Sequence, residues 1–200
     1  VEGQCDALVT TIREKAAPVR IGIDIGGTQT KIGLVDIHQK LIVSETMDTN
    51  AQRPAEEVIH EIAQKTLELL EAQGIAMDQC VGAGIGVPGT VDTKNGVVRY
   101  SNNIKWENVE LAKEIGNYLP IQIANDADCA TLGEAVAGAG KECQDVIMLT
   151  LGTGVGGGII IDGKIYEGKG LGGSELGHMV IVENGEPCTC GRRGCLEAYA

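Results

Sequence analysis

The sequence contains no phenylalanine, and its other aromatic residues are one tryptophan and four tyrosines. A core without many large rings has to be built from Ile, Val, Leu and Ala, which favours a tightly turned α/β protein over a barrel filled with Phe and Trp. Long apolar runs are also missing. The longest, 145–151 and 155–161, are strand-sized, whereas a membrane span needs ~20 residues. We therefore expect no transmembrane helix.

Positive charge is scarce as well. The chain has 16 Lys and Arg residues against 28 Asp and Glu residues, a net charge of −12, and its basic residues are scattered along the sequence. This balance argues against nucleic acids and anionic membranes as partners. The sequence does not open on a basic segment followed by an apolar run, so we expect no secretory signal and a cytoplasmic location.

Glycine is abundant, with 29 residues, and Gly-rich turns divide the chain into short elements. We predict a polar appendage over 1–18, followed by an antiparallel meander and then by alternating helices and strands. The predicted strands are 19–25, 31–37, 40–46, 80–87 and 121–124, with a hairpin at 95–96 and helices over 54–73, over 107–118 and from 125 onward. This order implies a mixed sheet with helices on its faces.

The pattern of 21–36 returns at 147–162, where an apolar strand, a turn of small residues and a second apolar strand follow one another again. The two segments share three identities at a constant offset, Ile21 with Ile147, Gly26 with Gly152 and Asp36 with Asp162. An internal duplication explains this match. So does the chance recurrence of Gly-rich turns between Ile and Val runs.

Both segments contain a turn suited to phosphate, Gly26-Gly27-Thr28 and Gly152-Thr153-Gly154. Such turns expose backbone N–H groups with no side chain in the way. Two of them facing each other across a cleft could close on a triphosphate for phosphoryl transfer. They are neither a P-loop nor a dinucleotide fingerprint, because each leads into a strand. The alternative is that both are merely tight hairpins.

Three of the seven cysteines are clustered, as Cys188-x-Cys190-x4-Cys195, and His178 lies ten residues before the first of them. Three thiolates and one imidazole make a closed tetrahedral Zn²⁺ site, which is structural because no position stays open for water. In a reducing compartment such a cluster indicates metal ligands rather than disulfides. The remaining cysteines lack this spacing and are predicted to be small buried apolar residues; they are Cys5, Cys80, Cys129 and Cys143.

Asp24 is a charge inside an Ile-rich strand, where burial is costly without compensation. Mg²⁺, held directly or through water, would supply that compensation, and Lys31 could help to neutralise phosphate. Asn125-Asp126 can be a helix cap, or Asp126 can be a general base. Asp128, two residues further on, is expected at the surface.

Five motifs resemble, in order, those of the ROK family (repressors, open reading frames, kinases): Asp24-Ile25-Gly26-Gly27-Thr28, Asn125-Asp126, the Gly-rich run 151–158, Glu175-Leu176-Gly177-His178, and the Cys/Gly signature 188–197. The resemblance runs from about residue 20 to the last residue. It implies an actin-like (ribonuclease-H-like) two-lobed α/β fold with duplicated halves. The bacterial glucokinases of this family are most similar, with N-acetylmannosamine kinases next.

The resemblance also implies roles for individual residues. Asp126 would be the general base that deprotonates a hexose hydroxyl, the 6-hydroxyl of glucose in the first instance. The residues matched to sugar contacts are Asn103, Asn125, Asp126, Glu175, His178 and Glu197. Those expected to hold ATP and Mg²⁺ are Asp24, Gly26, Gly27, Thr28, Lys31, Gly152, Thr153 and Gly154. The rivals are an N-acetylmannosamine kinase, a non-catalytic sugar-binding protein and a sugar-sensing regulator. The regulator would need a winged helix–turn–helix, for which the segment before Val19 is too short.

The resemblance divides the chain into a first lobe over 19–124 and the start of a second over 125–200, with the zinc knuckle at 178–195. Family members continue beyond the position of Ala200, so we expect the second lobe to be incomplete in this chain. On that expectation the 200 residues alone would bind sugar weakly and ATP more weakly still. The complete protein is expected to be a homo-oligomer, most simply a dimer.

Overall fold

The computed structural model describes residues 18–116, 120–152, 154–168 and 174–200. Apart from Pro18, the predicted appendage over 1–18 lies outside the described residues, and so does Cys5 within it. Thr153, of the predicted turn Gly152-Thr153-Gly154, lies outside them as well. The helices and strands of the first part are β1 (Val19–Ile25), β2 (Gln29–Val35), β3 (Leu41–Asp48), α2 (Ala55–Ala72), η1 (Met77–Gln79), β4 (Cys80–Val87), β5 (Thr90–Asp92), β6 (Val97–Ser101), β7 (Trp106–Val109), α3 (Leu111–Ile115) and β8 (Ile121–Asn125). They are followed by α4 (Asp126–Ala137), β9 (Val146–Leu151), β10 (Val155–Ile161), β11 (Lys164–Ile165), η2 (Leu176–His178) and η3 (Leu196–Ala198).

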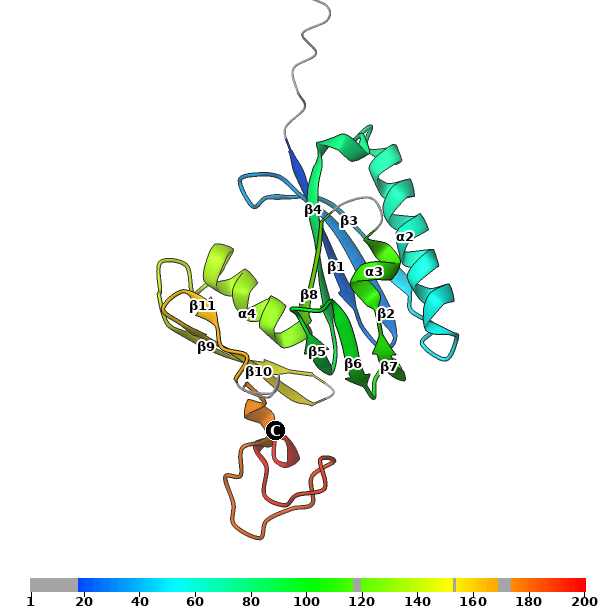
Figure 1. Ribbon diagram of the computed structural model, residues 1–200. Helices are drawn as coiled ribbons and strands as arrows, with labels where there is room; N and C mark the ends of the chain where they lie inside the picture. Colours follow the sequence, from blue (N-terminus) through cyan, green and yellow to red (C-terminus); the bar gives the residue numbers. More distant parts are fainter. Residues whose placement is uncertain (1–17, 117–119, 153, 169–173) are drawn as a thin grey trace, which may run out of the picture.

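The largest sheet has five strands in the order β3-β2-β1-β4-β8. β1, β2 and β3 form the predicted antiparallel meander, while β4 and β8 run parallel to β1. Along β1 the buried positions alternate with exposed or half-buried ones, so Ile21, Ile23 and Ile25 all face the same core. Figure 1 shows α2 lying along this sheet, with α3 near its lower half. The predicted mixed sheet with helices is therefore confirmed.

Helix α2 forms where the apolar residues recur with the helical period. Pro54 precedes its first turn, and Gly74 follows its end at φ +66°. This is a left-handed conformation that Gly adopts more easily than other residues, and it commonly ends helices. The buried side chains of this helix are Val58, Ile59, Ile62, Thr66, Leu69 and Leu70. Five of these six are apolar and join the isoleucines of the sheet in one core.

A matched pair of substitutions on α2 tests this packing. Ile62 is fully buried, whereas Leu67 is 48% exposed on the same helix. Ile62→Ala is expected to lower the free energy of unfolding by about 2–5 kcal/mol, because it removes buried methyl groups and leaves a cavity. Leu67→Ala should cost less than about 1 kcal/mol. Urea unfolding of both variants measures the difference, and equal losses would contradict this packing.

The predicted helix over 107–118 is wrong at its start. Trp106–Val109 is the strand β7, which pairs with β6 through Tyr100↔Glu107 and Ser101↔Trp106. Asn108 has φ +51°, outside the right-handed helical region, and Trp106 is 3% exposed in the core. Helix α3 begins only at Leu111. Pairing with β6 and burial of the indole override the local helical pattern here.

The second hairpin predicted from the repeated pattern is present as β9 and β10, which form a sheet in the order β11-β10-β9. Helix α4 packs between this sheet and β4. The close approach depends on glycine: a Cβ on Gly158 would lie 2.0 Å from Thr131 Oγ1 of α4. Both Gly-rich segments therefore fold as strand, turn and strand.

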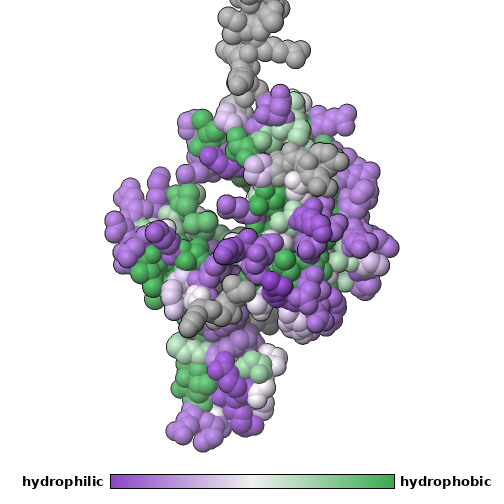
Figure 2. All heavy atoms as spheres, viewed as in Figure 1, coloured by the Kyte–Doolittle hydropathy of each residue, from purple (hydrophilic) through white to green (hydrophobic). Residues whose placement is uncertain are grey.

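Apolar side chains are exposed on β9 and on the C-terminal segment. Ile147, Leu149 and Leu151 of β9 are 48–75% exposed, and the run 179–182 is 42–54% exposed. Figure 2 shows apolar surface both over the β9–β11 part and on the C-terminal segment. These side chains have no apolar cover within the described part of the chain. No helix there is long and apolar enough to cross a membrane.

Candidate active site

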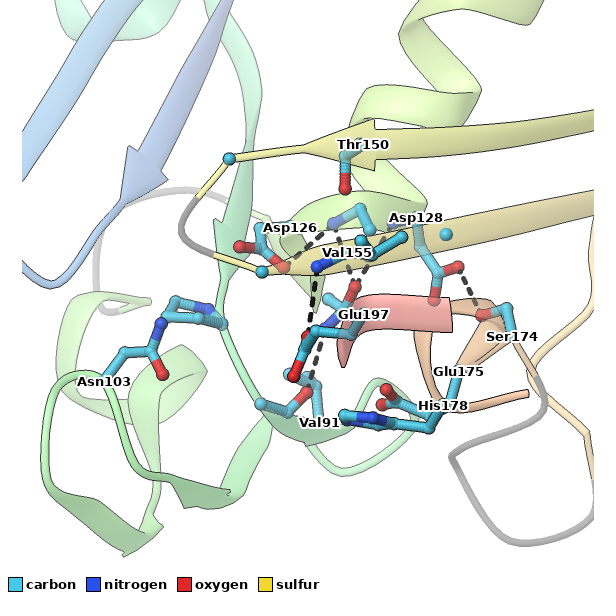
Figure 3. Close-up of a pocket in the computed structure, with 18 of the residues that line it drawn as sticks. Val91, Asn103, Asp126, Asp128, Thr150, Val155, Ser174, Glu175, His178 and Glu197 are labelled. Carbon is cyan, nitrogen blue, oxygen red and sulfur yellow. Dashed lines mark hydrogen bonds between the residues drawn. The ribbon is translucent and has the colours of Figure 1, made fainter. Parts of the chain in front are cut away.

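A cavity of about 490 Å³ opens where β4 and β8 end, between these strands, the β9–β10 turn and the C-terminal segment. In open α/β sheets, ligands bind outside the carboxyl ends of parallel strands, and β4 and β8 are such a pair. The side chains predicted to contact a sugar all line this cavity: Asn103, Asn125, Asp126, Glu175, His178 and Glu197. Figure 3 shows Asn103 facing Asp126 and Glu197 from the other side of the space.

Asn125 and Asp126 occupy the start of α4, and they do different work. Asn125 is the helix cap: its Oδ1 accepts hydrogen bonds from the N–H groups of Ala127 (2.9 Å) and Asp128 (3.4 Å), and its Nδ2 donates to the Gly89 carbonyl at 3.0 Å. Asp126 also lines the cavity, and it is not the cap. The cap therefore leaves Asp126 available to a ligand.

Burial raises the pKa of the Asp126 carboxyl above its ordinary value, and the charge of Asp24 raises it further, while the N–H of Ala127 opposes both. The raised pKa makes this carboxylate a stronger proton acceptor than an exposed aspartate. Cavities that combine such a shifted carboxyl with nearby N–H groups are typical of active sites.

The expectation that Asp24 is a buried charge is wrong. It points to the exposed face of β1, between the buried Ile23 and Ile25, and it pairs in register with Lys31 of β2 on the same face. The exposed position removes the burial cost, so the structure itself does not require a compensating cation at Asp24. Its charge still acts on Asp126.

The first turn lies beside the cavity without lining it. Gly26 N–H donates to the Gln29 carbonyl at 2.9 Å. A Cβ on Gly27 would lie 3.0 Å from the Asn103 carbonyl oxygen, so this turn packs against the loop that carries Asn103. Like these two glycines, Asp24, Thr28 and Lys31 are not among the cavity residues.

The second turn borders the cavity directly through Gly152 and Gly154. It is closed by a hydrogen bond from Gly152 N–H to the Gly154 carbonyl at 3.0 Å. Gly154 packs against Glu197, since a Cβ at this position would lie 2.5 Å from Glu197 Oε2. The turn is therefore in contact with a residue predicted to bind sugar.

The carboxylate of Glu197 is held on both oxygens. Oε2 accepts the N–H of Val155 at 3.0 Å, and Oε1 accepts the hydroxyl of Thr189 at 2.8 Å. The Val155 N–H lowers the pKa of Glu197, with a further contribution from Thr189. Glu197 is thus an ionised hydrogen-bond acceptor at neutral pH.

The donor atoms of His178, Cys188, Cys190 and Cys195 all lie within 4.8 Å of one another. Cys190 Sγ is 3.7 Å from Cys195 Sγ, and Cys188 Sγ is 3.6 Å from His178 Nδ1. Tetrahedral zinc with Zn–S bonds of about 2.3 Å requires sulfur atoms about 3.8 Å apart. The four side chains therefore fit a zinc ion, with His178 turning Nδ1 to the cluster and leaving Nε2 outside it.

The model of the ROK family matches residues 20–200 of the chain. The chain belongs to the ROK family. Among known relatives it is 42% identical to the glucokinase of Thermotoga maritima over 185 residues, which cover 90% of this chain and 56% of that protein. It is 33% identical to a putative xylose repressor of Caldicellulosiruptor, covering 90% of this chain and 46% of that protein.

Solved ROK structures show the same fold. The ROK glucokinase of Streptomyces griseus, in complex with glucose and AMPPNP, superimposes with a TM-score of 0.77 at 37% identity and covers 91% of this chain and 57% of that one. The ROK hexokinase of Thermus thermophilus gives 0.79 at 30% identity, covering 91% and 60%. The chain thus has the actin-like fold of ROK kinases. It spans about half the length of the relatives it matches.

Two expectations about polar residues of this ROK chain are wrong. Asp128, expected at the surface, is 8% exposed, and its Oδ1 accepts the hydroxyl of Ser174 at 3.1 Å (Figure 3). Burial raises its pKa, and the Ser174 hydrogen bond opposes that rise. Cys143 is exposed, while Cys80 and Cys129 are only partly buried.

Further cavity residues were not predicted from the sequence. They include Asp128, Ser174, Thr150, Glu167 and Tyr100. Asp128 carried a usable signal, because α4 begins at Asp126 and a residue in the same first turn stays near its helix terminus. The others come from separate strands and loops, and no local pattern brings them together.

Proposed function

We propose that this ROK protein is an ATP-dependent hexose kinase that phosphorylates the 6-hydroxyl of glucose or a related aldohexose. The observation that carries the proposal is the position of Asp126, a partly buried carboxylate with a raised pKa inside a polar cavity that also borders the Gly152–Gly154 turn. A hydroxyl placed in this cavity meets a proton acceptor and lies next to a turn suited to phosphate.

In this proposal Asp126 accepts the proton of the sugar hydroxyl while the hydroxyl oxygen attacks the γ-phosphorus of ATP, and ADP leaves. Asn103, Asn125, Glu175, His178 and Glu197 hold the sugar through its hydroxyl groups. The two turns, at 26–28 and 152–154, hold phosphate oxygens from their respective lobes, 19–124 and 125–200. Closure of the lobes would exclude water and limit wasteful hydrolysis of ATP.

Two metal ions belong to the proposal. Asp24 would hold Mg²⁺ directly or through water, and this ion neutralises phosphate charge. The chain has a net charge of −12, so in this proposal local N–H groups, Mg²⁺ and Lys31 hold the ATP phosphates. His178, Cys188, Cys190 and Cys195 would hold a structural Zn²⁺ that fixes the loop carrying Glu175 and His178.

A sugar-sensing regulator is the second candidate, because xylose repressors match the chain as well. A sensor needs a sugar pocket but no proton acceptor aimed at a hydroxyl beside a phosphate turn. The placement of Asp126 therefore favours the kinase. We also propose that the protein is cytoplasmic and forms a homo-oligomer, and that its partners include neither nucleic acids nor membranes.

A coupled assay of ADP release on the intact protein tests the function. ATP, Mg²⁺ and one sugar at a time are supplied, with glucose, mannose, N-acetylmannosamine and xylose as the panel. The kinase predicts sugar-dependent ADP release with glucose or a close aldohexose. Preference for N-acetylmannosamine would move the substrate to the acetamido sugars. Sugar binding by calorimetry without any ADP release would favour the regulator.

A further inference from the structure

Glu197 connects two parts of the molecule that are far apart in sequence. Its Oε2 accepts the N–H of Val155, the first residue after the second phosphate turn, and its Oε1 accepts the hydroxyl of Thr189, which stands between Cys188 and Cys190. Figure 3 shows the bond to Val155 at the centre of the cavity. One carboxylate thus touches the cavity, the turn and the Cys knuckle.

The contact with the turn is tightly fitted. A Cβ on Gly154 would come within 2.5 Å of Glu197 Oε2, so only glycine lets the carboxylate reach the N–H of Val155. Val155 itself is 6% exposed. At the other end, Leu196 N–H donates to the Met179 carbonyl at 2.9 Å and fixes the start of η3. The main chain of Glu197 is therefore placed by η3, and its side chain by Val155 and Thr189.

Within the described part of the chain, the contacts of the Thr189 side chain point to Glu197. The Thr189 side chain is exposed, so it contributes little to a core, and it is not one of the four candidate metal donors. Its hydroxyl bonds to Glu197 at 2.8 Å, whereas its distance to Cys188 Sγ is 4.0 Å. The short contact is with the carboxylate, and a hydrogen bond to a charged acceptor is stronger than a neutral one.

We propose that Thr189 is a positioning residue, whose hydroxyl holds the Glu197 carboxylate in place between the sugar cavity and the second phosphate turn. This inference rests on the proposed function for its effect on the sugar, but the geometry it describes does not. Through this link the knuckle sets the orientation of a sugar ligand and restrains the N–H at the end of the turn. Loss of the hydroxyl frees one oxygen of Glu197 and loosens its bond to Val155.

The test compares Thr189→Val, which keeps the shape and removes the hydroxyl, with Thr189→Ser, which keeps the hydroxyl. In the intact, zinc-loaded protein, Thr189→Val is expected to raise the KM for glucose about fivefold and to change kcat less than twofold. Amide hydrogen exchange at Val155, followed by NMR, is expected to accelerate about fivefold as well. Thr189→Ser should stay within twofold of the parent in both measurements, and all three proteins should keep the same zinc content.

Gly154→Ala provides a second variant, because its added methyl displaces Glu197 from the turn and leaves the four candidate metal donors unchanged. It should raise the KM for glucose at least as much as Thr189→Val while zinc stays bound. The proposal is overturned if Thr189→Val loses zinc, or if it keeps zinc with unchanged KM and unchanged Val155 exchange. A parent protein that phosphorylates no hexose would refute the proposed function instead, and the exchange rates at Val155 would still decide the role of Thr189.

Discussion

Asp126→Asn is expected to lower kcat by ~10²–10⁴-fold, because the amide cannot accept the proton of the sugar hydroxyl. The side chain keeps its size and can still accept a hydrogen bond from the Ala127 N–H, as Asp126 Oδ1 does at 2.9 Å. Helix α4 keeps its cap, since that role belongs to Asn125. Sugar binding should therefore persist, with a dissociation constant within a few-fold of the parent. Calorimetry with glucose and steady-state kinetics measure the two quantities separately.

Asp128→Asn is the matched comparison for Asp126→Asn. Both carboxylates line the cavity from the first turn of α4 and both have a raised pKa. Asp128 is turned toward Ser174, however, and an asparagine there can still accept that hydroxyl. We expect its kcat to fall by less than tenfold. Ordinary turnover in Asp126→Asn would remove that residue from the base role, and equal losses in both variants would show that neither is the specific base.

If the candidate site holds zinc as proposed, Cys195→Ala is expected to abolish zinc binding and to raise the KM for glucose by at least ~100-fold. Structural zinc contributes about 10–16 kcal/mol in small Cys/His sites, whereas a hydrogen bond contributes only about 0.5–1.5 kcal/mol. Backbone hydrogen bonds within the knuckle, such as Cys188 N–H to the Arg192 carbonyl at 2.9 Å, are each far weaker than a structural metal site. Without the ion, His178 loses its anchor and Thr189 no longer holds Glu197, so the sugar loses two contacts together.

Cys143→Ala is the control for this experiment, because Cys143 is exposed and lies outside the metal cluster. It should keep one zinc per chain and its KM. Metal content by plasma emission and glucose kinetics on the same samples give both readouts. A parent protein that contains no zinc and is fully active would contradict the structural role of the cluster.

Much of the fold could be predicted from the sequence where the signal is local. Helix α2 follows the apolar period from 58 to 70, with Pro54 and Gly74 at its ends. The Cys/His cluster could also be predicted, since three of its candidate donors lie within eight residues and this spacing brings the thiols together. Trp106–Val109 could not be assigned this way, because its strand depends on pairing with β6.

The candidate site was predictable residue by residue only through family motifs, and its internal connections were not predictable at all. The bond between Glu197 and Val155 spans 42 residues, and that between Ser174 and Asp128 spans 46. No periodicity encodes contacts of this kind, which depend on how α4, β10 and the C-terminal segment pack. The exposure of Asp24 also follows from the sheet, because only one face of β1 is buried.

The most direct test of the central claim is ³¹P NMR of the intact protein with ATP, Mg²⁺ and glucose, run in parallel with Asp126→Asn. Phosphoryl transfer to the 6-hydroxyl predicts that a sugar 6-phosphate resonance and the ADP resonances grow in equal amounts with the parent protein. The variant should produce neither on the same time scale. Formation of inorganic phosphate in place of the sugar phosphate, or equal formation of sugar phosphate by the variant, would contradict the account.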